Sequence, residues 1–467
     1  MKNVDSLHPA YAEMQHRWQI TRDNTENRVK EKASTYLIKN QSHVNDADKF
    51  NRFAERSVYF PITAHTHSTF TGLIFSEGET IKEIPKALEA ATTNINGAGL
   101  TLDEQVQQAT GEVLSQGRAG VLVDFPTVEG AENATLADVE AGRFTPRLLL
   151  YKAEQIINWR ANESDPSKLD LLVLHELVQD RIDTFKTEAV EQWRVYSRNE
   201  AGAIEVVVYR RDEDDKDTFV EHVEPLLVRD SRGNMSDIPW VWIGAENNDA
   251  KPDMPPMFGL AQMNVAHFRN SAGYEMTAHL AGSPTPFASG LTENWVTKFM
   301  ADKVALGAES LIKLPAGGTL GMIQANPSSM EAEAMRSKEA IMIGLGARLV
   351  MPSDQIKTAT QANIENKNTT SILSQIARNV SSAYEKALTI ALAFISTESP
   401  NIVYQINDDF TALSADAPML AEILRQYQGG GLTFGEYRAY VKKIGVAHED
   451  DTDASDLIDI DVIDDDA

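Results

Sequence analysis

The chain has 467 residues, of which 42% are hydrophobic and 24% are charged, fractions that are ordinary for globular proteins. Its length suggests about two to four lobes. Because cysteine is absent, disulfides, thiolate catalysis and cysteine-ligated metals are excluded. The formal net charge of -26 opposes a grip on nucleic acid, which depends on Lys and Arg at phosphates, although acidity could equally serve solubility alone.

Two segments bear on export and membranes. The N-terminal text MKNVDSLHPAYAEMQ contains no apolar core of a signal peptide. The longest charge-free stretch, residues 57–76, contains Pro61, two histidines and four threonines, and is too polar to cross a bilayer. We therefore expect a protein that is neither exported through a signal peptide nor inserted in a membrane.

The first part of the chain is polar and compatible with helices. Sparse apolar anchors without strand alternation predict short helices over residues 8–59. A further helix is predicted over residues 102–116, after the N-cap candidate Thr101, with one apolar stripe that should be buried. The stripe consists of Leu102, Val106, Ala109, Val113 and Leu114.

The character of the sequence changes after Gly117. The following runs are β-branched or aromatic: GVLVDF, RLLLYKAEQIINWR, LDLLVLHEL, EQWRVYSR, IEVVVYRR and PLLVRD. Separated by Gly, Asn, Asp and Pro, they predict a lobe that is mainly sheet. The connection NEAG predicts a hairpin, and the acidic run at residues 212–217 predicts a solvated turn and not a metal site.

Two predicted helices flank a compact insertion. Small residues dominate a predicted helix over residues 258–281, about 36 Å long at about 1.5 Å per residue, which should have close neighbours. Prolines and paired glycines predict strands and turns over residues 282–326, around one short helix near Trp295. A second helix is predicted over residues 330–350, so the two helices form an out-and-back stalk.

The C-terminal third contains a break and a long helix. Pro352 precedes a helical pattern over residues 358–396, whose polar first turns indicate either a wet cavity or a frayed start. Its apolar stripe is Ile372, Ile376, Val380, Ala383, Ala387, Ile390 and Phe394. A strand, IVYQIN, and a helical hairpin follow. Residues 449–467, with ten acidic and no basic side chains, are expected to be disordered.

The sequence contains no convincing catalytic signature. The pattern GxxxxGK followed by Ser or Thr is absent, and so is a GxSxG elbow. His175 and Glu176 begin an HExx pattern whose fifth residue is Gln179, so a strand is favoured over a zinc site. His65 and His67 are spaced to share one side of a strand, but no carboxylate lies nearby in sequence. We predict no catalytic, metal or cofactor site.

The remaining charged and aromatic groups favour structural roles. Asp408 and Asp409 follow a strand, where paired acids usually cap a turn or a helix. Lys357, Lys367 and Arg378 lie on or beside the long helix and are interpreted as solvated charges, with a DNA contact as the alternative. Six tryptophans without basic neighbours predict core positions and not a base-stacking platform: Trp18, Trp159, Trp193, Trp240, Trp242 and Trp295.

The order of these elements resembles the portal proteins of tailed bacteriophages. Three phrases strengthen the resemblance: YKAEQIINWR at residues 151–160, PPMFGLAQMNVAHFRNSAGYEMTAHLAGSPTPFASG at residues 255–290 and KTATQANIENKN at residues 357–368. They are similar to a portal subgroup catalogued as a domain of unknown function. The likeness runs from Pro9 to Gly445, and the acidic tail after it matches no family function.

The resemblance implies an α+β portal fold. Its parts would be an α/β wing (1–257), a stem helix (258–281), a small α/β clip (282–329), a second stem helix (330–350), a tunnel loop (351–360), a wing return with the long helix (361–414), a short helical crown (415–448) and the acidic tail (449–467). The implied site residues are Pro352, Ser353, Asp354, Gln355 and Lys357 in the tunnel loop, Leu260, Met263, His267, Tyr274, Ile341 and Leu345 in the stem, and Trp295, Phe299, Leu311 and Leu314 in the clip. Gln355 and Lys357 are expected to project into a channel.

The resemblance also implies partners. We expect a homo-oligomeric ring of about twelve subunits at the portal vertex of a virion, assembled in the host cytoplasm. The ring would contact the major capsid protein and scaffold, the large terminase subunit and tail adaptors, and would pass double-stranded DNA without sequence specificity. The alternatives are another head-tail structural protein, such as an adaptor or minor capsid protein, and a soluble acidic enzyme with an unrecognised site.

Overall fold

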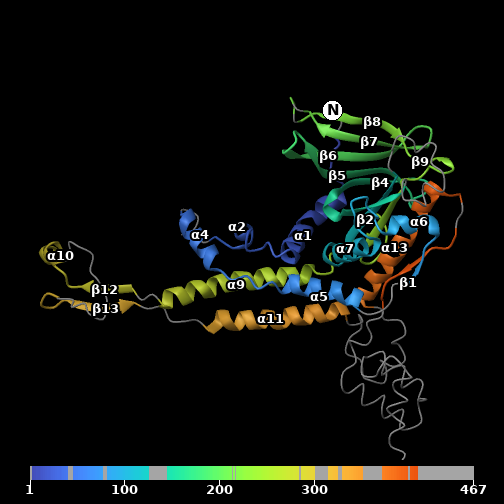
Figure 1. Cartoon of the computed structure of the whole chain (residues 1–467). Helices are drawn as coiled ribbons and strands as arrows, with labels where there is room; N and C mark the ends of the chain where they lie inside the picture. The colour runs from blue at the N-terminus through green and yellow to red at the C-terminus, as the bar shows by residue number, and fades with distance from the viewer. Residues whose placement is uncertain are drawn as a thin grey trace, which may run out of the picture. The chain divides into compact units, whose positions relative to one another are not determined.

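The chain forms two compact units in a computed structural model (Figure 1). The structure describes residues 3–39, 46–76, 81–125, 145–212, 214–215, 217–282, 285–299, 314–323, 329–350, 371–397 and 400–408. We call one unit the body; it comprises Met1–Arg22, His65–Gly259 and Gly344–Ala467. The other unit, the arm, comprises Asp23–Ala64 and Leu260–Ile343.

Helix α7 (Leu102–Gln116) shows how local sequence sets a body element. Thr101 and Glu104 form a capping box, in which the Thr101 hydroxyl accepts from the Glu104 amide and the Glu104 carboxylate accepts from the Thr101 amide. Gly117 ends the helix with a left-handed φ of 73°, which a side chain would disfavour. The predicted stripe is confirmed, since all five of its members are buried.

The body contains two antiparallel sheets of three or more strands among its described residues. The larger has the order β4-β5-β6-β7-β8, from β4 (Ile156–Ala161), β5 (Leu169–Arg181), β6 (Thr187–Arg198), β7 (Ile204–Arg211) and β8 (Phe219–Leu227). The smaller has the order β11-β2-β3, from β11 (Trp240–Gly244), β2 (Arg118–Asp124) and β3 (Arg147–Lys152). The predicted hairpin between β6 and β7 is confirmed, because the Asn199 side chain accepts from the amides of Ala201 and Ala203 and Gly202 has φ 82°.

Short elements complete the body. Helix α1 (Pro9–Thr25) and helix α5 (Ile62–Ser76) each begin or end in the arm, whereas α6 (Lys86–Thr92) and the 3-10 turn η2 (Ala153–Gln155) lie wholly within the body. Strand β1 (Ile81–Glu83) pairs with β14 (Val403–Gln405), and β9 (Arg229–Asp230) with β10 (Gly233–Asn234). The β1–β14 pair therefore joins two segments that are more than 300 residues apart in sequence.

Tryptophans occupy the body core, as predicted. Trp18, Trp159, Trp193 and Trp240 are buried in one cluster, and Trp242 packs against it half-buried. The Trp18 indole N–H donates to the Gln116 carbonyl over 2.9 Å, so its polar group is satisfied inside the core. The sixth, Trp295, lies in the arm and is half-buried.

Helix α13 (Ile372–Ile395) corresponds to the long predicted helix. It begins after the N-cap Ser371, whose side chain accepts from the Ser374 amide; residues 358–370 of the prediction lie outside the described residues. The buried face differs from the predicted stripe: Ile372 is 39% exposed and Ile390 and Phe394 are half-buried, whereas Tyr384 and Leu388, outside the stripe, are fully buried. The cause is packing on more than one side, against α7 and against β11 and β2.

The spacing of His65 and His67 would place both side chains on one side of a strand, but the segment that contains them is not a strand. This stretch contains helix α5, where neighbours two apart point in different directions. His67 Nε2 lies 2.9 Å from the Gly111 carbonyl oxygen. The pair therefore does not share one side, which removes the geometric basis for joint metal binding.

The arm contains the predicted stalk and insertion. Helix α9 (Phe258–Gly282) enters it from the body, and helix α11 (Ser329–Val350) returns to the body. Between them lie β12 (Thr285–Ser289), α10 (Glu293–Phe299) and β13 (Thr319–Ile323), with β12 and β13 paired antiparallel. Two short helices, α2 (Ala33–Tyr36) and α4 (Ala47–Arg56), come from the N-terminal part of the chain. A mixed α+β fold is thus confirmed.

Candidate assembly surface

One buried amide in the arm joins helix α9 to residues 60–63. Asn264 of α9 is fully buried, and its Oδ1 accepts from the Thr63 amide at 3.1 Å and the Thr63 hydroxyl at 3.0 Å. Its Nδ2 donates to the Phe60 carbonyl at 2.8 Å. Beside it the rings of Tyr59 and Phe268 meet edge to face, and burial raises the pKa of Tyr59 above its usual range. Residues 59–63 are thereby fixed against α9.

Helices α9 and α11 run antiparallel along the arm, and Figure 1 draws them side by side. His267 Nε2 lies 3.2 Å from Glu339 Oε1, and Lys338 Nζ donates to Asn270 Oδ1 over 3.3 Å. At Gly273 an added Cβ would stand 3.1 Å from Glu331 Oε1, so a glycine lets the carboxylate approach. These polar contacts therefore join α9 and α11 along their facing sides.

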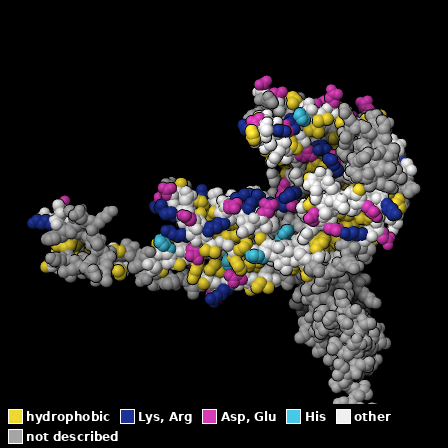
Figure 2. Space-filling view, viewed as in Figure 1, with side chains coloured by type: hydrophobic (Ala, Val, Ile, Leu, Met, Phe, Trp, Pro, Cys, Tyr) yellow, Lys and Arg dark blue, Asp and Glu magenta, His cyan; other side chains and the backbone are white. Residues whose placement is uncertain are grey.

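Most of the remaining apolar surface of these helices is uncovered. In α9 the buried residues end at Ala272, and in α11 Met342 is 1% exposed while Ile343 is 71% exposed. Figure 2 shows hydrophobic side chains gathered over this part of the molecule. The exposed large apolar residues of the arm helices are Tyr274, Leu280, Val296, Met330, Ile341 and Ile343. Helices that are apolar on several sides normally bury those sides against other elements.

The hairpin of β12 and β13 is apolar on both faces. Phe287 lies over Gly321, where an added Cβ would meet the phenyl ring at 2.6 Å. Leu320 and Met322 alternate with Gly321 along β13 and are therefore on the other face, at 45% and 65% exposure. Two strands alone are marginally stable in water, and large apolar side chains on both faces of this pair are exposed.

The structure separates the predicted site residues into four groups. Leu260 and His267 of the stem are buried, Met263 and Leu345 are half-buried, and Tyr274 and Ile341 are exposed. In the clip, Trp295 and Leu314 are half-buried, and Phe299 is the last residue of α10. Outside the described residues lie Leu311, the tunnel-loop residues Pro352, Ser353, Asp354, Gln355 and Lys357, the crown (415–448) and the tail (449–467).

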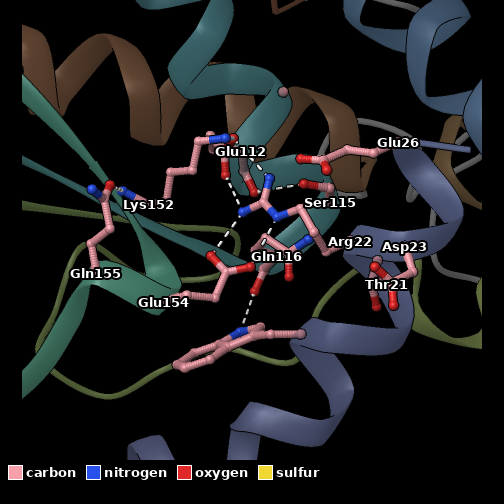
Figure 3. Close-up of polar contacts among 12 residues, drawn as sticks. Thr21, Arg22, Asp23, Glu26, Glu112, Ser115, Gln116, Lys152, Glu154 and Gln155 are labelled. Carbon is pink, nitrogen blue, oxygen red and sulfur yellow. Dashed lines mark hydrogen bonds and ion pairs between the residues drawn. The ribbon is translucent and has the colours of Figure 1, made fainter. Parts of the chain in front are cut away.

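Sequence reasoning missed the principal buried ion pairs of the body (Figure 3). Arg22 of α1 donates to Glu112 Oε2 at 2.6 Å and to Glu154 Oε2 at 2.8 Å, and Lys152 Nζ lies 3.3 Å from Glu112 Oε1. Although burial alone would raise the pKa of Glu112, the hydrogen bonds and charge of Arg22 hold that pKa below its usual value. No local pattern could reveal the cluster, because its members are 90 and 132 positions apart.

A second buried arginine is enclosed by aromatic rings. The Arg118 guanidinium carbon lies 4.1 Å from the Trp159 ring centre and 4.0 Å from the Trp242 ring centre. Burial lowers the pKa of Arg118 to about 9. Like Arg22, this cation is buried in the body and is not exposed at its surface.

Other charged groups that the sequence singled out are engaged locally. His175 and Glu176 lie on β5, as predicted, and Glu176 accepts from Gln192, Arg194 and Tyr151 inside the body. Asp408 accepts from Arg378 Nε at 2.6 Å, so it is a partner of α13 and Arg378 is not simply solvated. Within the described ranges no group of three or more His, Asp or Glu side chains is placed to hold a metal ion. No described helix has the length and apolar character needed to cross a membrane.

A family model matches one part of the chain, and solved structures match most of its length. Residues 256–395 match the model of a family described as a domain of unknown function, DUF4055. The matched span starts two residues before α9 and ends at the last residue of α13, so it contains α9, α10, α11 and the β12–β13 pair of the arm but not α2 or α4. No curated protein matches the sequence.

Two solved structures are similar to the chain. One is from the virion of a native gene transfer agent particle, with 15% identity and a TM-score of 0.40, covering 83% of this chain and 90% of that one. The other is from the neck of an empty gene transfer agent particle, with 14% identity and a TM-score of 0.39, covering the same shares of the two chains.

Proposed function

We propose that this chain is a portal subunit of a tailed bacteriophage or phage-like particle. One observation carries the proposal: the arm, in which α9 and α11 run antiparallel and bracket the β12–β13 hairpin, exposes apolar side chains from both helices and from both faces of the hairpin. A subunit with this surface is incomplete alone. Closure of a head-to-tail ring would cover it with neighbouring copies.

In this proposal residues 1–257 and 361–414 correspond to the wing, and α9 and α11 are the stem. The β12–β13 hairpin with α10 is the clip, which would dock the packaging motor and later the tail adaptors. Residues 351–360 would form the tunnel loop and residues 415–448 the crown. The ring would stand at one vertex of the capsid, in contact with the major capsid protein and the scaffold.

The charge of the chain supports a conduit and not a clamp. Each phosphate held by Lys or Arg would add salt-dependent affinity that a moving duplex must repeatedly break. The net charge of -26, together with the burial of Arg22 and Arg118, reduces that affinity. A pore of such subunits would let DNA slide during packaging and ejection.

Native mass measurement and negative-stain imaging of the purified full chain test the proposal. We expect a closed ring of about a dozen 51.6 kDa subunits with a central hole. A ring without a hole wide enough for a duplex would favour an adaptor. A monomer or dimer that binds a small molecule tightly would instead point to an enzyme and refute the portal function.

A further inference from the structure

The tip of the β5–β6 hairpin presents one aromatic side chain to solvent. Phe185 is 98% exposed, the highest exposure among the large apolar residues described. The turn beneath it is ordered by Asp183, whose Oδ1 accepts from the amides of Phe185 and Lys186 at 2.6 and 2.7 Å. We call this feature, residues 182–186, the knob. Phe185 is thus an exposed aromatic side chain on an ordered turn, and aromatic residues are enriched at protein interfaces.

The same unit contains a hollow of about 930 Å³. It lies between α13, strand β11 and the loop that precedes β5. Its apolar lining includes the buried Ile238 and Leu392 and the half-buried Ile390 and Ala393. The volume is within the range of about 300–1,000 Å³ of pockets that enclose ligand-sized groups, so an aromatic ring and its turn would fit.

The knob and the hollow lie at opposite ends of one strand. Leu169, the first residue of β5, lines the hollow, and Arg181, the last, leads into the knob. The 13 residues of β5 separate them by about 40 Å at about 3.3 Å per residue. A subunit therefore cannot place its knob in its own hollow, whereas a second copy can.

The charges around the two features permit this contact. The knob carries Asp183 and Lys186, and the rim of the hollow carries Asp249 and Lys386. Since both surfaces contain both signs, two copies would not repel each other there. Two different complementary surfaces at opposite ends of a subunit are what a head-to-tail ring requires.

We propose that Phe185 of each subunit inserts into the hollow of the next subunit in the ring. This inference rests on the proposed function, since it names one of the contacts that would close the ring. It concerns the body alone and is independent of the arm surface described above.

The absence of cysteine permits a direct test in the full chain. The pair Thr184→Cys and Ser382→Cys places one thiol in the knob and one in the hollow while leaving Phe185 intact. After mild oxidation, a denaturing gel should show a ladder at multiples of 51.6 kDa. The matched control pairs Thr184→Cys with Thr93→Cys, an exposed site of the same unit that does not line the hollow, and should give no ladder.

Replacing the phenyl side chain tests the role of Phe185 itself. Adding Phe185→Asp to the cross-linking pair should lower the yield of linked species about tenfold, whereas Phe185→Leu should retain it. Both variants should fold, because the Phe185 side chain is 98% exposed and does not pack in the core.

The outcomes separate the inference from the function. If native mass measurement shows a ring and the gel shows the ladder, both the knob contact and the portal function are supported. A ring whose two thiols react with a soluble reagent but form no ladder overturns the knob contact and leaves the portal function standing. A chain that remains monomeric at all concentrations overturns the portal function, and the contact with it.

Discussion

Helices of similar length differ in how far they are buried in the body and in the arm. In the body, α13 has 24 residues and buries apolar side chains along most of its length, from Leu373 to Leu392. In the arm, α11 has 22 residues, yet Ile341 and Ile343 are exposed on either side of the buried Met342. The body therefore buries this helix within one chain, whereas the described part of the arm leaves large apolar side chains exposed. Changes in the two units should differ in kind as well as in size.

The largest loss of stability should follow from Trp18→Ala in the body. The substitution removes a fully buried indole from the core cluster and a hydrogen bond to the Gln116 carbonyl. We expect a loss of about 3–5 kcal/mol in the free energy of unfolding, measured by chemical denaturation. A loss below about 1 kcal/mol would mean that the body core does not hold the subunit together.

Arg22→Ala should cost nearly as much, about 3–5 kcal/mol, because Glu112 and Glu154 would lose the cation that they share. The dependence on pH has a definite sign. Because the folded-state pKa of Glu112 is depressed below its ordinary 4.5, the carboxylate stabilises the body above that pH, and the stabilisation is lost as the pH falls through the folded-state pKa. The difference in unfolding free energy between wild type and Glu112→Gln should therefore shrink below about pH 4. A constant difference down to pH 2 would contradict the ion pair.

Thr101→Ala should have a smaller effect, about 1 kcal/mol, through the loss of the cap of α7. Thr101→Ser keeps the hydroxyl and should restore most of the loss. Thermal unfolding of the three proteins gives the comparison. Equal midpoints for alanine and serine would show that the capping box does not contribute.

The smallest change in subunit stability should come from the arm. Ile343→Ser alters a side chain that is 71% exposed and should shift the unfolding free energy of the isolated subunit by less than about 0.5 kcal/mol. It should nevertheless reduce assembly, seen by native mass as a shift from ring to monomer. The neighbouring Met342→Ser is the matched control, since that residue is 1% exposed and its loss should destabilise the subunit by about 2–5 kcal/mol. If Ile343→Ser left assembly unchanged, the contrast between body and arm would fail at this position.

Elements with a strong local pattern could be predicted from the sequence. The stripe and cap of α7, the β6–β7 hairpin and the helix–hairpin–helix order of the arm all follow from periodicity and turn residues. The helix over residues 62–76 was not predicted, because a Thr-rich segment with little amphipathic character gives no clear period. Its Thr, Phe, Ile and Gly residues have low helix propensity, so contacts with neighbouring elements decided that segment.

Much of the candidate site was not visible in the sequence. The residue types of α9 and α11 predict a stalk rich in small residues. The exposure of Ile343 and the burial of Met342, however, depend on which neighbour each side chain contacts. The knob at Phe185 lies in a turn whose polar residues look ordinary. Its significance comes from a hollow about 40 Å away along β5, built mainly from residues more than fifty positions later.

The sequence by itself determined the net acidity, the absence of cysteine chemistry, the mainly β middle region and the two helices around the insertion. These depend on composition or on neighbours within a few positions, where periodicity and turn preferences act. Only the tertiary structure decided that Arg22 would join Glu112 and Glu154, that Arg118 would lie between two indoles, and which faces of the arm remain bare. Such pairings join residues far apart in the chain, and their energy exists only once folding has removed the groups from water.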